Sequence, residues 1–186
     1  MTRLLARGRT VAAVGLLLAA ALGLLAATQP WGSALLVDGR LLTATGQDLA
    51  GGLTILALAC AVLALVLPIA GRVWRAVLGL LALALGAGLV TQVLATRDGV
   101  RAVLDALVAE ATGIAGSAQS AEVARIAVDG WPAAGIAAGA VAVLVGLWVL
   151  VTGHRWPART PRAARYERSG SGLAWDVMDD GEDPTR

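Results

Sequence analysis

Four long uncharged stretches dominate the pattern of hydrophobic and polar positions along the chain. They are rich in Ala, Leu, Val and Gly and occupy residues 11–27, 49–70, 77–95 and 131–152. At 1.5 Å per residue, even the shortest would form a helix roughly 26 Å long, near the lower limit for crossing a bilayer. The pattern predicts four transmembrane helices.

Short polar segments define how these stretches connect. Residues 71–76 join the second and third so tightly that the two helices must form an antiparallel hairpin. Pro132 opens the fourth stretch, and proline is favourable in a first helical turn because its missing N–H breaks no hydrogen bond there. Residues 1–156 are therefore predicted to form a transmembrane domain, followed by a tail at residues 157–186.

The longest polar connection, residues 96–130, carries apolar side chains at helical spacing. They are Val100, Val103, Leu104, Leu107, Val108 and Ala111. This spacing predicts a short amphipathic helix that lies on the membrane surface or caps the bundle. A second helical stretch is expected from Ser120 to Val128. We interpret the segment as a packed connector, since no residue set supports a ligand-sensing lid.

Composition supports a membrane protein. Hydrophobic residues make up 58% of the chain and charged residues 15%, against about 25% charged residues in soluble domains. The net charge is only +2, and the basic residues flank apolar stretches instead of forming a nucleic-acid-binding face. Cys60 is the sole cysteine, so the chain has no internal disulfide and Cys60 is expected to be a packing residue.

Arginine placement predicts the orientation of the helices. Three arginines precede the first stretch, two lie between the second and third, and six follow the fourth, which is eleven of the fifteen in the chain. The other two connections hold the remaining four. Both termini are therefore predicted in the cytoplasm, with residues 96–130 outside the cell membrane. The first stretch is longer than most signal-peptide cores and lacks a good cleavage site, so we expect it to be retained. The alternative is a cleaved signal peptide, which would leave the other three helices in the same orientation.

The residue types that carry catalysis do not cluster in this sequence. His154 is the only histidine, and no Ser/His/Asp set, Cys/His pair or phosphate loop can be assembled. No catalytic, cofactor-binding or metal-binding residue is predicted, and the protein is not expected to be an enzyme. The apolar stretches contain no interior ionisable residue of the kind that ion-coupled carriers hold at membrane depth. A transport pathway through so small a bundle would need a homo-oligomer.

Tryptophans fall at the predicted ends of the helices, where amphipathic indole rings favour the membrane interface. We predict that Trp31, Trp74, Trp131 and Trp156 are interfacial anchors. The alternative is a stacked site for an indole-like ligand.

The tail is rich in Arg, Ser and Gly and then acidic, and it ends in WDVMDDGEDPTR. It cannot bury enough apolar area to fold alone, so it is predicted to be disordered without a partner. One interpretation is a solvated tail that balances the preceding arginines. The other interpretation is a docking motif for a cytoplasmic or membrane protein. A buried aromatic side chain surrounded by charged residues often contributes most of the binding energy of a protein–protein interface. The candidate docking residues are Trp175, Asp176, Asp179, Glu182, Asp183 and Pro184.

Several short motifs resemble a known family. They are Gln29-Pro30-Trp31, Thr45-Gly46-Gln47-Asp48-Leu49-Ala50, Arg155-Trp156-Pro157, Arg165-Tyr166-Glu167, Trp175-Asp176 and Gly181-Glu182-Asp183-Pro184-Thr185. In this order they resemble the actinobacterial tryptophan-biosynthesis-associated membrane proteins. The family pattern usually reads like WDALDRGEDPT, and this chain departs from it at Val177, Met178 and Asp180.

The resemblance implies a four-helix membrane protein with a cytoplasmic tail. Together with the residue pattern, it predicts an all-α integral membrane protein with four transmembrane helices, a short extracytoplasmic amphipathic segment and a disordered cytoplasmic tail. It implies a link to tryptophan biosynthesis and location in the cell membrane, without a molecular activity or site residues. We expect a non-enzymatic accessory or scaffold protein. The alternative is a small oligomeric transporter or exporter of tryptophan, indole or a related aromatic compound. Neither expectation includes a cofactor or nucleic acid; the partners would be the lipid bilayer and a protein held by the tail.

Cysteine-accessibility labelling tests the predicted orientation. With Cys60 replaced, a cysteine at Ser117 should react with a membrane-impermeant reagent applied outside intact cells, because the arginine-poor connections face outward. A cysteine at Ala163 in the tail is the control and should react only after the membrane is opened. Labelling of the Ser117 position from the cytoplasmic side alone would contradict the predicted topology.

Overall fold

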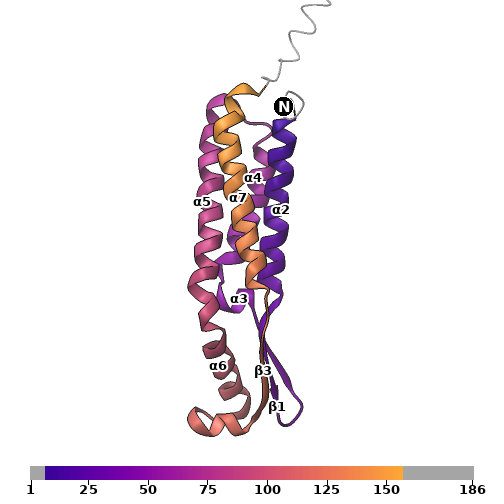
Figure 1. Ribbon diagram of the computed structural model, residues 1–186, viewed down its shortest axis with the longest axis vertical. Coiled ribbons are helices and arrows are strands. Elements are labelled where there is room, and N and C mark those ends of the chain that lie inside the picture. The colour runs from indigo at the N-terminus through magenta and orange to yellow at the C-terminus, as the bar shows by residue number, and fades with distance from the viewer. Residues whose placement is uncertain (1–6, 157–186) are drawn as a thin grey trace, which may run out of the picture. The chain divides into compact units, whose positions relative to one another are not determined.

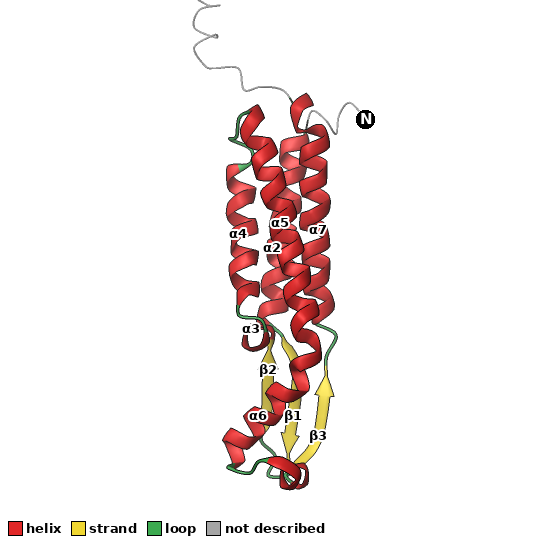
Figure 2. Cartoon of the chain, turned by 90° about the vertical axis from the view of Figure 1, so that its left-hand side faces the viewer, coloured by secondary structure: helices red, strands yellow, loops and turns green. Residues whose placement is uncertain are grey.

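The structure is a computed structural model that describes residues 7–156. The order of its elements is α2 (Gly8–Thr28), β1 (Pro30–Leu36), β2 (Leu41–Thr45), α3 (Gly46–Leu49), α4 (Gly52–Val66), α5 (Arg72–Thr96), η1 (Arg97–Gly99), α6 (Val100–Thr112), η2 (Gly116–Ala121), β3 (Val123–Val128), α7 (Pro132–Thr152) and η3 (Gly153–Arg155). Helices α2, α4, α5 and α7 form a bundle, and the three strands with α6 lie beyond one end of it (Figures 1 and 2).

Three helical segments are long and apolar enough to cross a membrane. Within residues 7–156, the first of these segments is α2, the second begins with α5 at Arg72 and continues through η1 to the end of α6, and the third is α7 followed by η3. The fourth predicted helix is present as α4, which has 15 residues and is therefore shorter than the expected stretch, residues 49–70. It is shortened at the start by the separate turn of α3 and at the end by Pro68, which has no N–H to extend the helical hydrogen bonding.

Glycines bring α5 and α7 together at the level of their backbones. A Cβ atom on Gly86 would lie 2.7 Å from the carbonyl oxygen of Gly139, and one on Gly139 would lie 2.6 Å from the carbonyl oxygen of Gly86. Two helical turns further along α7, a Cβ on Gly146 would lie 2.8 Å from the carbonyl oxygen of Gly79. Small residues permit such approach, and the resulting dispersion attraction drives helix association in lipid.

Helix α2 packs through its own small residues against α4 and α7. Gly15 lies against Val145, and Gly23 lies against Ala57. On the same helix, Ala12, Leu16 and Ala19 are fully buried. The interior of the bundle is thus filled by short apolar side chains at close helix spacing.

The structure also contains a three-stranded antiparallel sheet, which corrects the all-α prediction. Its strand order is β2-β1-β3, and β1 pairs with both neighbours (Figure 2). Residues Val123–Val128, expected to be helical, form β3. They are rich in β-branched side chains, which favour strands once a partner is present. That partner, β1, lies far away in the sequence, so local periodicity did not reveal the pairing.

The amphipathic helix of the 96–130 segment is present as α6. Its buried side chains Val100, Leu104 and Val108 follow the predicted apolar spacing. They pack on the sheet, where Val100 and Leu104 contact the backbone at Gly32. The helix therefore covers the sheet, a surface that the sequence pattern did not reveal. Together, α6, η2 and the three strands are called the sheet module below.

Alanine substitutions at the glycines of α5 test the backbone contact with α7. Gly86→Ala should lower the free energy of unfolding by about 1–3 kcal/mol, because its methyl group meets a backbone carbonyl that cannot move aside. Gly88→Ala is the matched control on the same helix. Its methyl group would meet only the end of the Leu56 side chain, at 3.3 Å, so stability should change little. Unfolding in detergent followed by circular dichroism measures both, and equal losses would contradict the proposed contact.

Candidate functional site

At the end of the bundle away from the sheet, Arg75 and Trp156 form a buried cluster that we call the Arg75–Trp156 clamp. The Arg75 side chain donates hydrogen bonds from Nε to the carbonyl oxygen of Ala70 (3.0 Å) and from Nη1 to those of Gly153 (3.1 Å) and Trp156 (3.4 Å). Its guanidinium carbon lies 5.7 Å from the centre of the Trp156 ring. The indole Nε1 donates to Thr152 Oγ1 at 3.1 Å.

The clamp satisfies polar groups that a helix end leaves without partners. Arg75 and Trp156 are only 4% and 3% exposed, so unpaired polar groups there would be costly. The last carbonyls of a helix lack intrahelical partners and carry partial negative charge, which a cation stabilises. Arg75 supplies that charge to the end of α7 and to the turn before α5. Within residues 7–156 no carboxylate pairs with Arg75.

The clamp also joins a third helix. The Trp156 ring lies directly on Gly8, the first residue of α2, where a Cβ atom would overlap the indole. Both ends of the described chain therefore lie together at this end of the bundle (Figure 1). Trp156 is the last residue of the compact transmembrane unit, so the chain leaves the bundle at a side chain that contacts α2, α5 and α7.

A second tryptophan organises the opposite end, between the bundle and the sheet module. Trp31 is fully buried, and its Nε1 donates to the carbonyl oxygen of Ala26 near the end of α2 at 2.8 Å. Gly46 packs on the same indole ring. Thr45 and Asp48 form a capping box, with the Thr45 N–H donating to Asp48 Oδ2 at 2.8 Å. We call this arrangement the Trp31 junction.

The junction unites two of the motifs on which the family resemblance rests, Gln29-Pro30-Trp31 and Thr45-Gly46-Gln47-Asp48. A comparison with protein families points to the same group. The profile of the tryptophan-associated transmembrane proteins matches residues 13–185, almost the whole chain. The chain belongs to this family. No curated protein and no solved structure matches it.

Family membership shows a transmembrane protein associated with tryptophan, as the resemblance implied. The matched region includes the bundle, the sheet module and the tail motif. The family description names no reaction and no ligand. The residues themselves must therefore indicate what the protein does.

The four predicted interfacial tryptophans divide into two groups. Trp74 and Trp131 are 65% and 39% exposed, so their rings are available to lipid. Trp31 and Trp156 are buried in protein, which corrects the prediction that their rings face the membrane interface. Each has its N–H bonded inside the protein, and each packs on a glycine that leaves room for the ring. Their positions near helix ends gave no signal that distinguished them from anchors.

The candidate docking residues of the tail, from Trp175 to Pro184, lie outside the described residues. The structure instead identifies Arg75, which in the sequence is only one of the arginines that orient the chain. A basic residue four positions after a glycine helix start has no sequence signature of burial. Only the return of α7 to this end of the bundle places carbonyl groups around it.

Replacing the buried arginine of the clamp tests its contribution to stability. Arg75→Gln should lower the free energy of unfolding by about 2–3 kcal/mol, because charge-assisted hydrogen bonds to buried carbonyls are lost. Arg72→Gln is the control, since Arg72 lies one turn earlier on the same helix and is exposed; it should change stability by less than about 0.5 kcal/mol. Detergent unfolding curves decide, and equal effects of the two variants would refute the clamp.

Proposed function

We propose that this protein is a non-enzymatic accessory protein of the cell membrane, which serves tryptophan metabolism by holding a protein partner at its cytoplasmic tail. The observation that carries the proposal is the Arg75–Trp156 clamp. It fixes the residue from which the tail begins, against three helices of the bundle. The tail, which carries the candidate docking motif, therefore starts at a residue that is held at this end of the bundle.

The arrangement of the described chain supports four spans with both termini in the cytoplasm. Gly8 and Trp156 are in contact, so the chain enters and leaves the bundle at the same end. Arg72 and Arg75 at the start of α5 lie at that end, while Arg97, Arg101 and Arg125 belong to the segment at the other. The arginine-rich end is the cytoplasmic one. Helix α4 completes the fourth crossing with the turns that flank it.

Helix packing favours an accessory role over a carrier. The backbones of α5 and α7 touch at Gly86 and Gly139, and α2 closes on α7 at Gly15. Carriers need a polar path at membrane depth, and these interfaces are filled by Gly, Ala and Leu. Reconstituted protein that moves labelled tryptophan or indole across liposome membranes would support the carrier alternative instead.

Partner capture by the tail tests the proposed function. Trp175→Ala should abolish in-cell crosslinking of the full-length protein to its partner, because burial of an indole ring in an interface supplies roughly 2 kcal/mol or more. Charge reversal of Glu182 and Asp183 should weaken capture and reduce its salt dependence. Trp74→Ala is the control, since it removes an exposed tryptophan at the start of α5.

Membrane insertion and melting temperature of the Trp175→Ala variant should equal those of the unmodified protein. Loss of thermal stability in the purified variant would show that Trp175 is structural. Unchanged crosslinking would show that the tail does not dock the partner. Either result would overturn the proposal.

A further inference from the structure

The sheet module contains an open cleft of about 550 Å³ between α6, η2 and β3. Its walls carry both charged and apolar side chains. The residues relevant here are Arg101, Asp105, Gln119, Val123, Arg125 and Ile126. Sites for small molecules are commonly concave and of this size, with a few polar groups that orient the ligand.

Helix α6 supplies one wall because of the way it covers the sheet. Val100, Leu104 and Val108 turn toward the strands and are buried. Arg101 and Asp105 follow the first two of these by one residue and lie one helical turn apart, so they occupy the adjoining face. That face borders the cleft.

The other walls are held in place by hydrogen bonds. Strand β3 is hydrogen-bonded to β1, with Arg125 opposite Leu35. The Gln119 side chain donates a hydrogen bond from Nε2 to the carbonyl oxygen of Asp105, which ties η2 to α6. The cleft is thus built from three segments that are anchored within one module.

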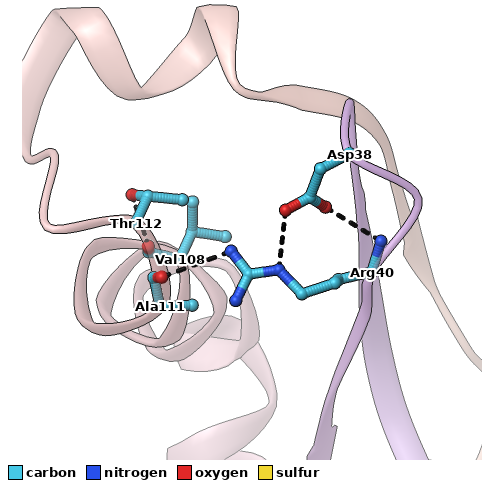
Figure 3. A network of polar contacts seen from close by, with 5 residues as sticks. All are labelled: Asp38, Arg40, Val108, Ala111 and Thr112. Atoms are coloured by element: carbon cyan, nitrogen blue, oxygen red, sulfur yellow. Dashed lines mark hydrogen bonds and ion pairs between the residues drawn. The ribbon is translucent and has the colours of Figure 1, made fainter.

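Arg40 is an arginine of the sheet module whose side chain is held by protein partners. Its Nε lies 2.7 Å from Asp38 Oδ2, and its Nη2 donates to the carbonyl oxygen of Ala111 at 3.3 Å, which ties the β1–β2 hairpin to α6 (Figure 3). The backbone N–H and the guanidinium of Arg40 both hold the pKa of Asp38 below its usual value.

Unlike Arg40, the charged side chains that line the cleft have no ion-pair partners in the described protein. Within residues 7–156, the guanidinium groups of Arg101 and Arg125 form neither an ion pair nor a hydrogen bond, and the Asp105 carboxylate has no ion-pair partner. Two positive groups and one negative group therefore line one cleft beside the apolar side chains of Val123 and Ile126.

We propose that this cleft binds an α-amino acid with an apolar side chain. Guanidinium groups recognise carboxylates through paired, charge-assisted hydrogen bonds, so Arg101 and Arg125 would hold the ligand's carboxylate. The Asp105 carboxylate would accept hydrogen bonds from the ligand's ammonium group, and Val123 and Ile126 would contact the ligand's apolar side chain. The site lies in the sheet module and does not depend on docking by the tail.

Calorimetric titration of the full-length protein in detergent tests the proposal. The first probe is L-tryptophan, chosen because the family is associated with tryptophan, and the second is L-leucine. At least one should bind to a single site. For tryptophan, tryptamine lacks the carboxylate and N-acetyl-L-tryptophan lacks the ammonium group; each should bind at least roughly tenfold more weakly, since each loses a charge-assisted contact.

Substitutions then locate the site. Arg101→Gln and Arg125→Gln should each weaken binding roughly tenfold or more. Their melting temperatures without ligand should not change, because both side chains are exposed. Arg97→Gln is the control: it removes the same charge from an exposed arginine just before α6, outside the cleft.

Absence of binding by both amino acids would overturn the proposal, as would equal weakening by Arg97→Gln, which would indicate diffuse charge attraction. Trp175→Ala should bind the amino acid with unchanged affinity. Failure of the cleft proposal therefore leaves the tail proposal intact, and the reverse also holds.

Discussion

The contact of the α5 and α7 backbones through Gly86 and Gly139 is the constraint on which the rest of the molecule depends. Lipid tails are as apolar as the side chains, so no hydrophobic free energy is gained when a side chain moves from lipid to a neighbouring helix. Helix association in a membrane therefore relies on close packing. At these glycines the two helices touch without intervening side chains. The direction of α7 is thereby fixed: it begins beside the sheet module and ends beside Arg75.

Both ends of the bundle are then completed by the same physical means. A helix end leaves carbonyl groups without partners, and an apolar surrounding makes that costly. At one end Arg75 donates to the carbonyl of Gly153, and at the other Trp31 donates to that of Ala26. In both places an indole ring packs on a glycine, Gly8 or Gly46. Trp31 and Trp156 thus have buried structural roles at the two ends of the bundle.

The two proposed binding sites lie in different parts of the molecule. The sheet module presents arginine and aspartate side chains in a cleft, and the bundle between that cleft and the clamp is packed with small residues. At the clamp the chain leaves the bundle from Trp156, and the tail sequence is first rich in arginine and then acidic. The proposed amino-acid cleft and the start of the tail thus lie at opposite ends of a closely packed bundle, so each proposal can be tested without altering the other site.

Much of this architecture follows from the sequence, since long apolar stretches can satisfy their backbone in lipid only as helices. That constraint predicted α2, α5 and α7, and helical spacing predicted α6 and its buried residues. The pairing of β1 with β3 was not predictable from local pattern, because the chain from β2 to η2 separates the two strands in the sequence. The β1–β2 hairpin did carry a local signal, the Asp38-Gly39 turn, in which Gly39 has a positive φ. The burial of Trp31 and Trp156, in place of exposure to lipid, depended on which glycine came to lie beside each ring. Likewise, Arg101 and Arg125 share a cleft only because α6 and β3 pack in the same module. The local pattern of apolar residues determines which segments become helices. Contacts between segments that are distant in the sequence decide which polar groups meet, and these contacts exist only in the tertiary structure.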